Sequence, residues 1–275
     1  MSKEVKRLKL GFIGGGRMAE ALIKGLLASK KISPAAISVS VPSEGRREYL
    51  RTTYGVTTLF DNPEVVRKNP VVVLAVKPQV APSVLKEVRE AVKERGPLLL
   101  SVVAGLTLAR MAELLGGYSR IIRIMPNTPA LVLSGVSAIC GGEEAREEDL
   151  ELADQIFSLL GEVLRVPESL FDAVTGLSGS GPAYVFAFIE ALVDGGVKEG
   201  LPREVAEKLA VGTVLGAAKL MRETGENPYA LKAMVTSPGG TTIAGLKVLA
   251  ERGFHGAVME AVAAATRRSR ELSGG

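Results

Sequence analysis

The sequence predicts an α/β protein whose N-terminal domain holds a mostly parallel sheet and whose C-terminal domain is an all-α helical bundle. Short β-rich runs alternate with helical patterns over residues 1–166, as in a sheet with crossover helices. The runs VVVLAV and LLLSVV are apolar without alternation, which indicates strands covered on both faces. After Val166 only helical periodicity remains, so the domains are predicted at 1–166 and 167–275.

Eight β-rich segments account for the predicted sheet. Their ranges are 8–14, 37–41, 56–60, 70–76, 97–103, 120–126, 136–140 and 162–166. Amphipathic helices between them are clearest at 17–29, 83–95 and 146–161. In the second half, glycines and prolines break the helical pattern at 178–182, 195–202, 224–228 and 236–240. No break is long enough to be a linker, so we expect compactly connected helices.

Composition argues against several classes of protein. The net charge of +4 is spread along the chain, whereas nucleic-acid binding favours a clustered basic stripe. Cys140 is the only cysteine, which excludes an intramolecular disulfide, predicts no metal site and fits a reducing, cytoplasmic setting. No secretion signal is visible, and Glu190 and Asp194 interrupt the most apolar helix, 181–197, so we expect no membrane partner. Helices rich in Ala and Gly favour a helical subunit interface.

A glycine loop follows the first predicted strand and opens a helix. Gly14, Gly16 and Ala19 have the spacing G-x-G-x-x-A at the start of a βαβ unit, which is the context that supports dinucleotide binding. Gly14 permits the tight turn, Gly16 lets the backbone approach a pyrophosphate, and Ala19 lets the helix lie close to the strand. The sheet domain is therefore expected to be Rossmann-like, with the alternative that the glycines form only a structural turn.

The end of the second strand bears on which nicotinamide cofactor binds. An acidic residue at this place favours NADH, but the strand ends at Ser40 with no carboxylate before Glu44, and Arg46 and Arg47 follow. Hydroxyls and guanidiniums suit a 2′-phosphate, so NADPH is favoured. The alternative is that both arginines only solvate the next helix and that NADH binds as well.

Other strand ends are expected to line the same crevice, because ligands of open α/β sheets bind beyond the carboxyl ends of the strands. These are residues 75–78, 102–105 and 125–129. Lys77 and Asn127 could be ordinary strand-end and turn residues, but three tight turns in one sheet favour a cofactor rim.

The scarcity of acid/base residues narrows the chemistry. His255 is the only histidine, and it lies near the C-terminus where an ordinary surface or cap role is expected. The sheet domain offers no candidate other than Lys77. Reduction of an imine suits such a site, since its nitrogen can arrive protonated from water and the protein has mainly to position the electrophilic carbon.

Two long C-terminal motifs, TGLSGSGPAYVFAFIEALVDGGVKEGLP and VTSPGGTTIAGLKVLAERGF, together with GFIGGG, LAVKP and MPNTP, closely resemble pyrroline-5-carboxylate reductases, which catalyse the last step of proline synthesis. The resemblance covers essentially the whole chain, in order. It implies a C-terminal domain that interleaves with a second subunit, a homodimer that assembles further, commonly as a ring of five dimers, and hydride transfer from NAD(P)H to C5 of the pyrroline ring.

The resemblance also implies site residues. Thr242 is the expected catalytic residue, through a hydrogen bond to the ring nitrogen. The implied substrate-binding residues are Glu168, Ser237, Gly239, Gly240, Thr241 and Thr242. The implied cofactor-binding residues, with Ser40 added from the strand argument, are Ile13, Gly14, Gly15, Gly16, Arg17, Met18, Ser40, Asn62, Ala75, Val76, Lys77, Pro78, Val102, Val103 and Ala104. Met234 stands where some relatives place a polar residue, which puts a contact from there in doubt.

The loop SPGGTT, residues 237–242, fits a carboxylate on physical grounds as well. Successive backbone amides in a turn before a helix converge on an anion without a lysine. We expect Gly239 and Gly240 to allow unusual dihedrals and close approach, and Thr241 or Thr242 to cap the helix. The alternative is an ordinary helix–helix turn. The glycines of GLSGSGPAY, 176–184, are expected mainly to permit close packing where a long helix kinks.

Three other functions stay open. A regulatory Rossmann protein without chemistry would be expected to carry a damaged substrate loop, yet SPGGTT is intact. A β-hydroxyacid dehydrogenase would need a lysine on the helix after the sheet domain, and residues 172–192 contain none. The third is reduction of a related cyclic imine, such as the six-membered homologue, because the sequence does not distinguish that ring from the five-membered pyrroline ring.

Overall fold

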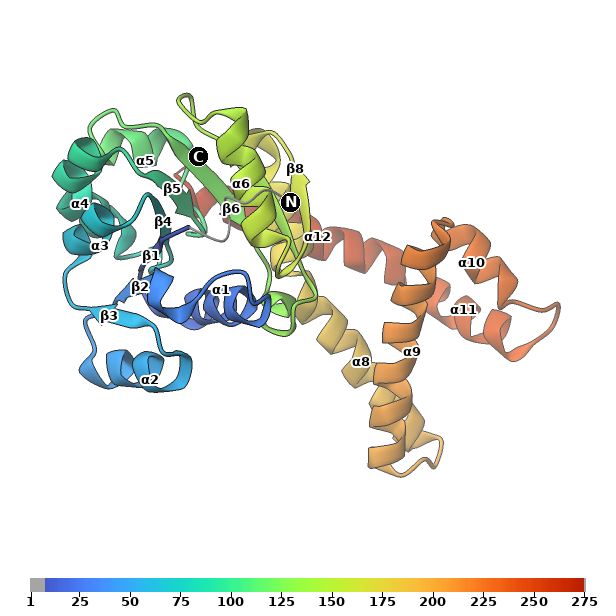
Figure 1. Cartoon of the computed structure of the whole chain (residues 1–275). Helices are drawn as coiled ribbons and strands as arrows, with labels where there is room; N and C mark the ends of the chain where they lie inside the picture. The colour runs from blue at the N-terminus through green and yellow to red at the C-terminus, as the bar shows by residue number, and fades with distance from the viewer. Residues whose placement is uncertain (1–7, 275) are drawn as a thin grey trace. The chain divides into compact units, whose positions relative to one another are not determined.

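The structure is a computed structural model that describes residues 8–274, and its central element is an eight-stranded sheet (Figure 1). All eight predicted strands are present within a few residues of their expected ranges. They are β1 Leu10–Ile13, β2 Ile37–Ser40, β3 Thr57–Leu59, β4 Val71–Leu74, β5 Leu98–Ser101, β6 Ile121–Met125, β7 Gly135–Gly141 and β8 Gly161–Arg165.

The strand order is β3-β2-β1-β4-β5-β6-β7-β8, and every neighbouring pair is parallel except the antiparallel pair β6–β7. The mostly parallel sheet is thereby confirmed. From β1 the chain first adds strands on one side, β2 and β3, and then returns to add β4 on the other. Such a reversal creates a crevice at the carboxyl ends of β1 and β4, where ligands of these folds bind.

Helices make up most of the rest of the described residues. They are α1 Arg17–Ala28, α2 Glu44–Tyr54, α3 Asn62–Lys68, α4 Ala81–Arg95, α5 Leu108–Leu114, α6 Glu147–Phe157, α7 Phe171–Val174, α8 Gly181–Lys198, α9 Arg203–Thr224, α10 Pro228–Met234, α11 Thr241–Glu251 and α12 Phe254–Leu272. Short 3₁₀ turns lie at Pro34–Ala36, Thr128–Val132 and Glu168–Leu170, and a π-helical turn lies at Thr175–Gly179.

Helices cover both faces of the sheet, which explains the continuous apolar runs in its central strands. One core joins side chains of α1, α2 and α6 to one face, with Leu22, Leu26 and Phe157 fully buried. The other core joins α3, α4 and α5 to the opposite face, with Leu85 and Met111 fully buried.

The chain divides into two compact units. One contains the sheet, continues to Gly179 and takes in the chain from Ala265 onward, and the other is residues 180–264. The sequence predicts the domain boundary where the strands end, at 166/167. The units divide later because the turns after β8 pack with the sheet unit, and the last turns of α12 join them there through a hydrogen bond from Ser269 to Asp172 at 2.6 Å.

The helical unit begins with α8 and α9, which pack through Val193, Ala206 and Ala210. Within the described residues, the helical stretch Glu168–Lys198 is 31 residues long and contains an 18-residue segment with a mean hydropathy of 1.2, so it has the length and composition of a membrane span. This differs from the expectation for residues 181–197 alone, because the structure joins the preceding turns to α8. The core helix of a soluble protein can have the same length and composition, although only 11% of this apolar segment is buried.

Candidate active site

The glycine loop after β1 lies at the carboxyl edge of the sheet. Gly14 adopts a left-handed φ of +98°, and a Cβ there would lie 2.6 Å from the Ala75 carbonyl oxygen, so only glycine fits. Its amide donates to the Ser40 carbonyl at 3.0 Å, and the Ala75 amide donates to the Ile13 carbonyl at 2.9 Å. The loop is thereby held between the ends of β1, β2 and β4.

The next two glycines differ in their surroundings. A Cβ at Gly15 would meet Val41 at 2.5 Å and Leu50 at 2.8 Å, so Gly15 permits close packing. A Cβ at Gly16, the residue that precedes α1, would meet nothing within 4 Å. The first amides of a helix have no partner inside the helix, and with Arg17 and Met18 these amides begin α1 beside open space. This is the arrangement that accepts a pyrophosphate.

Ser40 and Asn62 come from different elements and meet at the end of β2. The Ser40 hydroxyl donates to Asn62 Oδ1 at 2.6 Å, and Asn62 Nδ2 donates to Glu87 on α4 at 2.9 Å. Asn62 is the first residue of α3, which Asp61 caps by accepting the Glu64 amide at 3.0 Å. Ser40, expected from its position in the strand, and Asn62, expected only from the family resemblance, therefore lie together in the structure.

Arg46 and Arg47 were expected to offer guanidiniums to a 2′-phosphate, and in the structure both bind protein acceptors. Arg46 Nε donates to the Gly15 carbonyl at 2.7 Å, and its Nη2 pairs with Glu20. Arg47 Nη1 donates to the carbonyls of Val41 and Pro42 at 2.6 and 2.9 Å. Each arginine therefore makes contacts outside its own helix, and both lie beside the β2 end of the site.

The ends of β4 and β5 flank the same edge. The Val102 amide donates to the Leu74 carbonyl at 3.1 Å, which keeps residues 102–104 beside residues 75–78. Lys77 and Pro78 begin the exposed turn before α4, closed by the Val80 amide on the Lys77 carbonyl at 3.0 Å. Val103 is buried in the core, so a ligand contact from it would have to come from its backbone.

Asn127, at the end of β6, joins two segments of the sheet unit. Its Oδ1 accepts the Val136 amide at 2.9 Å, and its Nδ2 donates to the Ser178 carbonyl at 3.2 Å. Ser178 lies in the π-helical turn, where a Cβ at Gly179 would come 2.7 Å from the Met125 methyl. The expected close-packing role is thus present at Gly179, whereas Gly181 faces open space.

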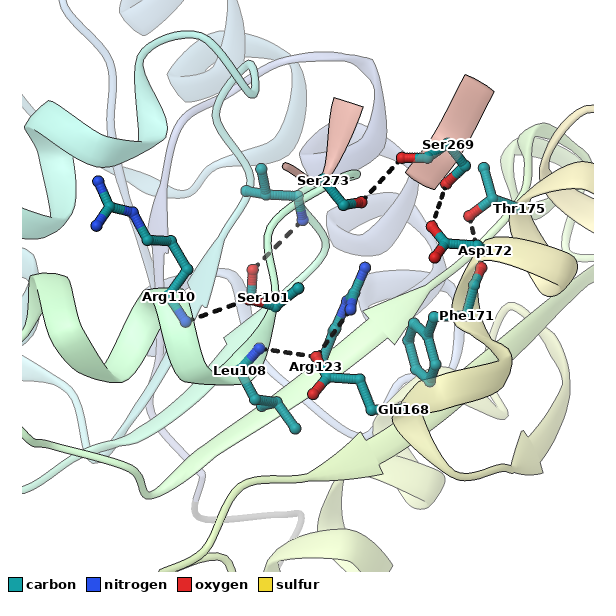
Figure 2. Close-up of polar contacts among 12 residues, drawn as sticks. Ser101, Leu108, Arg110, Arg123, Glu168, Phe171, Asp172, Thr175, Ser269 and Ser273 are labelled. Atoms are coloured by element: carbon teal, nitrogen blue, oxygen red, sulfur yellow. Dashed lines mark hydrogen bonds and ion pairs between the residues drawn. The ribbon is translucent and has the colours of Figure 1, made fainter. Parts of the chain in front are cut away.

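Glu168 follows β8, and Figure 2 shows its carboxylate between two donors. Its Oε1 accepts from the Leu108 amide and from Arg123 Nη1, both at 2.7 Å. The Arg123 side chain is only 6% exposed, and its guanidinium lies 4.7 Å from the centre of the Phe171 ring. Glu168 therefore ties the start of α5 and the middle of β6 to the segment that follows the sheet. Its role as a substrate contact stays a prediction.

The loop at 237–240 lies in the helical unit and leads directly into α11. Gly239 has a left-handed φ of +64°, as expected of a glycine turn, and the Gly240 amide donates to the Ser237 carbonyl at 3.1 Å. Gly240 has an ordinary φ of −79° and is itself the residue that caps α11. The expectation that Thr241 or Thr242 caps this helix is wrong, because the turn closes at Gly240 and both threonines lie inside the first turn.

Neither His255 nor Cys140 provides an acid or a base near the sheet at neutral pH, and the described residues show no metal site. His255 lies in α12 and is exposed, with its ring edge-on to Phe254. Burial and the Glu168 charge raise the pKa of the Cys140 thiol to about 12, against a lowering by Arg123, so the thiol is protonated and unreactive at neutral pH. Within residues 8–274 no group of His, Cys, Asp and Glu has the arrangement of a metal site.

The sequence analysis did not identify two charge clusters, one around the buried Arg123 and one around the half-buried Glu20. Arg123 could have been noticed as a charge within the apolar run RIIRIM, because a buried guanidinium needs a partner. Glu20 gave no such signal, since a carboxylate in the first turn of a helix is usual. Its carboxylate accepts from Arg46, Tyr49 and Tyr54, contacts that only the tertiary structure creates.

Comparison with known proteins covers both units. Residues 168–272 match the family described as pyrroline-5-carboxylate reductase dimerisation, and residues 9–105 match NADP oxidoreductase, coenzyme F420-dependent. A pyrroline-5-carboxylate reductase from Synechocystis sp. is 51% identical over 96% of this chain and 98% of its own length.

Solved structures give the same result. A pyrroline-5-carboxylate reductase from Coxiella burnetii has a TM-score of 0.92 and 37% identity, over 97% of this chain and 99% of that one. A pyrroline carboxylate reductase from Plasmodium falciparum, solved with NADP bound, has a TM-score of 0.87 and 33% identity, over 98% and 99% of the two chains.

Proposed function

This chain belongs to the pyrroline-5-carboxylate reductase family and is an NAD(P)H-dependent oxidoreductase, and we propose how its residues reduce L-1-pyrroline-5-carboxylate to L-proline with a hydride from NADPH. The observation that carries the mechanism is the left-handed Gly239 turn that leads into α11, because it offers main-chain donors to an anion without any basic side chain.

The cofactor is held along the carboxyl edge of the sheet. The open N-terminus of α1 at Gly16 binds the pyrophosphate, and Ser40 and Asn62 bind the ribose end. Backbone groups of residues 75–78 and 102–104 position the nicotinamide end. NADPH, when bound, supplies the hydride.

The substrate is held by residues 237–242. Amides of the first turn of α11 and the Ser237 hydroxyl bind its carboxylate, and the helix dipole adds to their attraction. The Thr242 hydroxyl hydrogen-bonds the ring nitrogen, which fixes the orientation of the ring and so of C5. C5 receives the hydride, the nitrogen keeps the proton that it brings from water, and the C=N double bond becomes a single bond. Orientation therefore does most of the catalytic work.

The helical unit carries the family's dimerisation region, and we propose a homodimer that assembles further into a ring of five dimers. Large apolar side chains of α8 and α9 are exposed in the single chain, among them Phe186 at 65% and Leu215 at 67%. An apolar surface of this kind is typical of subunit interfaces. It also gives a reason other than a membrane for the apolar, little-buried stretch at Glu168–Lys198. A cytoplasmic location, expected from the single cysteine, stays a prediction.

Sedimentation tests the assembly. We expect no active species smaller than a dimer, because a single chain leaves these helix faces in water. Velocity runs over a range of protein concentrations, with activity assayed across the fractions, would count against the interleaved domain if single chains were active. A dimer as the largest species would reject the ring alone.

Initial rates test the function. With pyrroline-5-carboxylate, kcat/KM is expected to be several-fold higher with NADPH than with NADH, since no carboxylate at the end of β2 repels a 2′-phosphate. The six-membered cyclic imine and a β-hydroxyacid with NADP⁺ are the comparison substrates. A higher kcat/KM for either of them would replace the proposed substrate.

A further inference from the structure

Glu20 forms a charge cluster beside the glycine loop. It lies in the first turn of α1, next to Ala19 of the glycine motif. Its Oε1 accepts the Tyr49 hydroxyl at 2.9 Å and the Tyr54 hydroxyl at 2.7 Å, and its Oε2 pairs with Arg46. The three donors come from α2, so one carboxylate joins the two helices that follow β1 and β2.

Arg46 is held over the loop by this cluster. Its Nε donates to the Gly15 carbonyl, inside the dinucleotide loop, and its guanidinium lies 4.8 Å from the centre of the Tyr49 ring. Three different contacts therefore fix one guanidinium. Arg46 is 29% and Glu20 is 20% exposed at the side chain, so solvent screens their pairing only in part.

The carboxylate is ionised at neutral pH. Burial by itself would raise the pKa of Glu20, but hydrogen bonds from Arg46, Tyr54 and Tyr49 outweigh it and hold the pKa below its ordinary value. Burial and the Glu20 carboxylate both raise the pKa of Tyr54, so its hydroxyl stays a donor. A full negative charge thus lies on the α2 side of the loop.

We propose that Glu20 is a specificity-determining residue that limits the preference of this enzyme for NADPH over NADH. It does so in two ways that act in the same direction. Glu20 occupies Arg46, whose guanidinium donates to the Gly15 carbonyl in the glycine loop, and it places a carboxylate against α2, the helix that follows the β2 end where these folds bind the adenosine ribose. The inference rests on the proposed binding of the cofactor along Gly14–Gly16.

The test is Glu20→Gln, which removes the charge and keeps the shape and the acceptor oxygen for the tyrosines. The ratio of kcat/KM with NADPH to that with NADH is expected to rise roughly fivefold, from release of a partly screened ion pair. The dissociation constant of 2′,5′-ADP, measured by calorimetry, is expected to fall by a similar factor, while that of 5′-AMP stays within twofold.

Glu48→Gln is the matched control, because it removes the same charge from the exposed ion pair with Arg51 on α2. Its ratio is expected to stay within twofold of the wild type. Arg46→Gln is an independent second variant, and the ratio is expected to fall, since the Glu20 charge is then unopposed.

An unchanged or lower ratio in Glu20→Gln, or an equal loss of both nucleotides, would overturn the inference. If Glu20→Gln does not fold, an unchanged or higher ratio in Arg46→Gln would overturn it instead. Either result leaves the proposed function intact as long as the wild type reduces pyrroline-5-carboxylate. A wild type inactive on that substrate would reject the function, while the calorimetric comparison would still decide the role of Glu20.

Discussion

Replacing Thr242 with alanine is expected to lower kcat for pyrroline-5-carboxylate roughly 10- to 100-fold. The dissociation constant of NADPH is expected to stay within twofold. Thr242 lies in the first turn of α11, two residues after Gly240, and its hydroxyl oxygen is the proposed acceptor for the proton on the ring nitrogen. Without it the imine can rotate about its carboxylate anchor, and C5 loses its alignment with the hydride. Steady-state kinetics and NADPH fluorescence titration measure the two quantities.

Two further variants isolate the hydroxyl. Thr242→Ser keeps the hydroxyl and is expected to recover most of kcat. Thr224→Ala removes a threonine whose hydroxyl donates to the Leu220 carbonyl at 2.9 Å at the end of α9, and it is expected to change neither quantity. If Thr242→Ala kept its kcat and lost only NADPH affinity, Thr242 would belong to the cofactor site.

The sheet could be predicted because its information is local. Each strand is a short apolar run between glycine, proline or polar turns, and the G-x-G-x-x-A spacing requires backbone freedom at known positions. The left-handed φ of Gly14 and the open space at Gly16 follow from that spacing. The loop before α11 was predictable for the same reason, apart from the cap, which differs by one residue because the turn closes at Gly240.

The side-chain partnerships could not be predicted, because their members lie far apart in the chain. Glu20 and Arg46 are 26 residues apart, and Arg123 and Glu168 are 45 residues apart. Whether two such charges meet depends on the register of helices on the sheet, for which a single sequence gives no pattern. The resemblance pointed to Glu168 but not to its partner, so it could not separate a substrate contact from a buried ion pair.

Glu168→Ala is expected to lower the free energy of unfolding by about 3–5 kcal/mol, because it leaves the Arg123 guanidinium buried without a counter-charge. The carboxylate also accepts the Leu108 amide at the start of α5, so that donor loses its partner as well. Arg123→Met is expected to cost less. It leaves behind a Glu168 side chain that is 31% exposed, and water can solvate that carboxylate. Urea denaturation at one fixed protein concentration measures both.

Glu113→Ala is the matched control for this pair. Glu113 forms an exposed ion pair with Arg110 on α5, at 2.5 Å, and its loss is expected to change the free energy of unfolding by less than about 0.5 kcal/mol. The measurement also decides between the two roles of Glu168. If Glu168→Ala unfolds at the wild-type urea concentration while the KM for pyrroline-5-carboxylate rises, its carboxylate acts on the substrate. The other outcome is that Glu168→Ala lowers the free energy of unfolding, while Glu168→Gln, which keeps an acceptor oxygen, retains the wild-type KM. In that case the carboxylate acts by holding β6, α5 and the segment after β8 together.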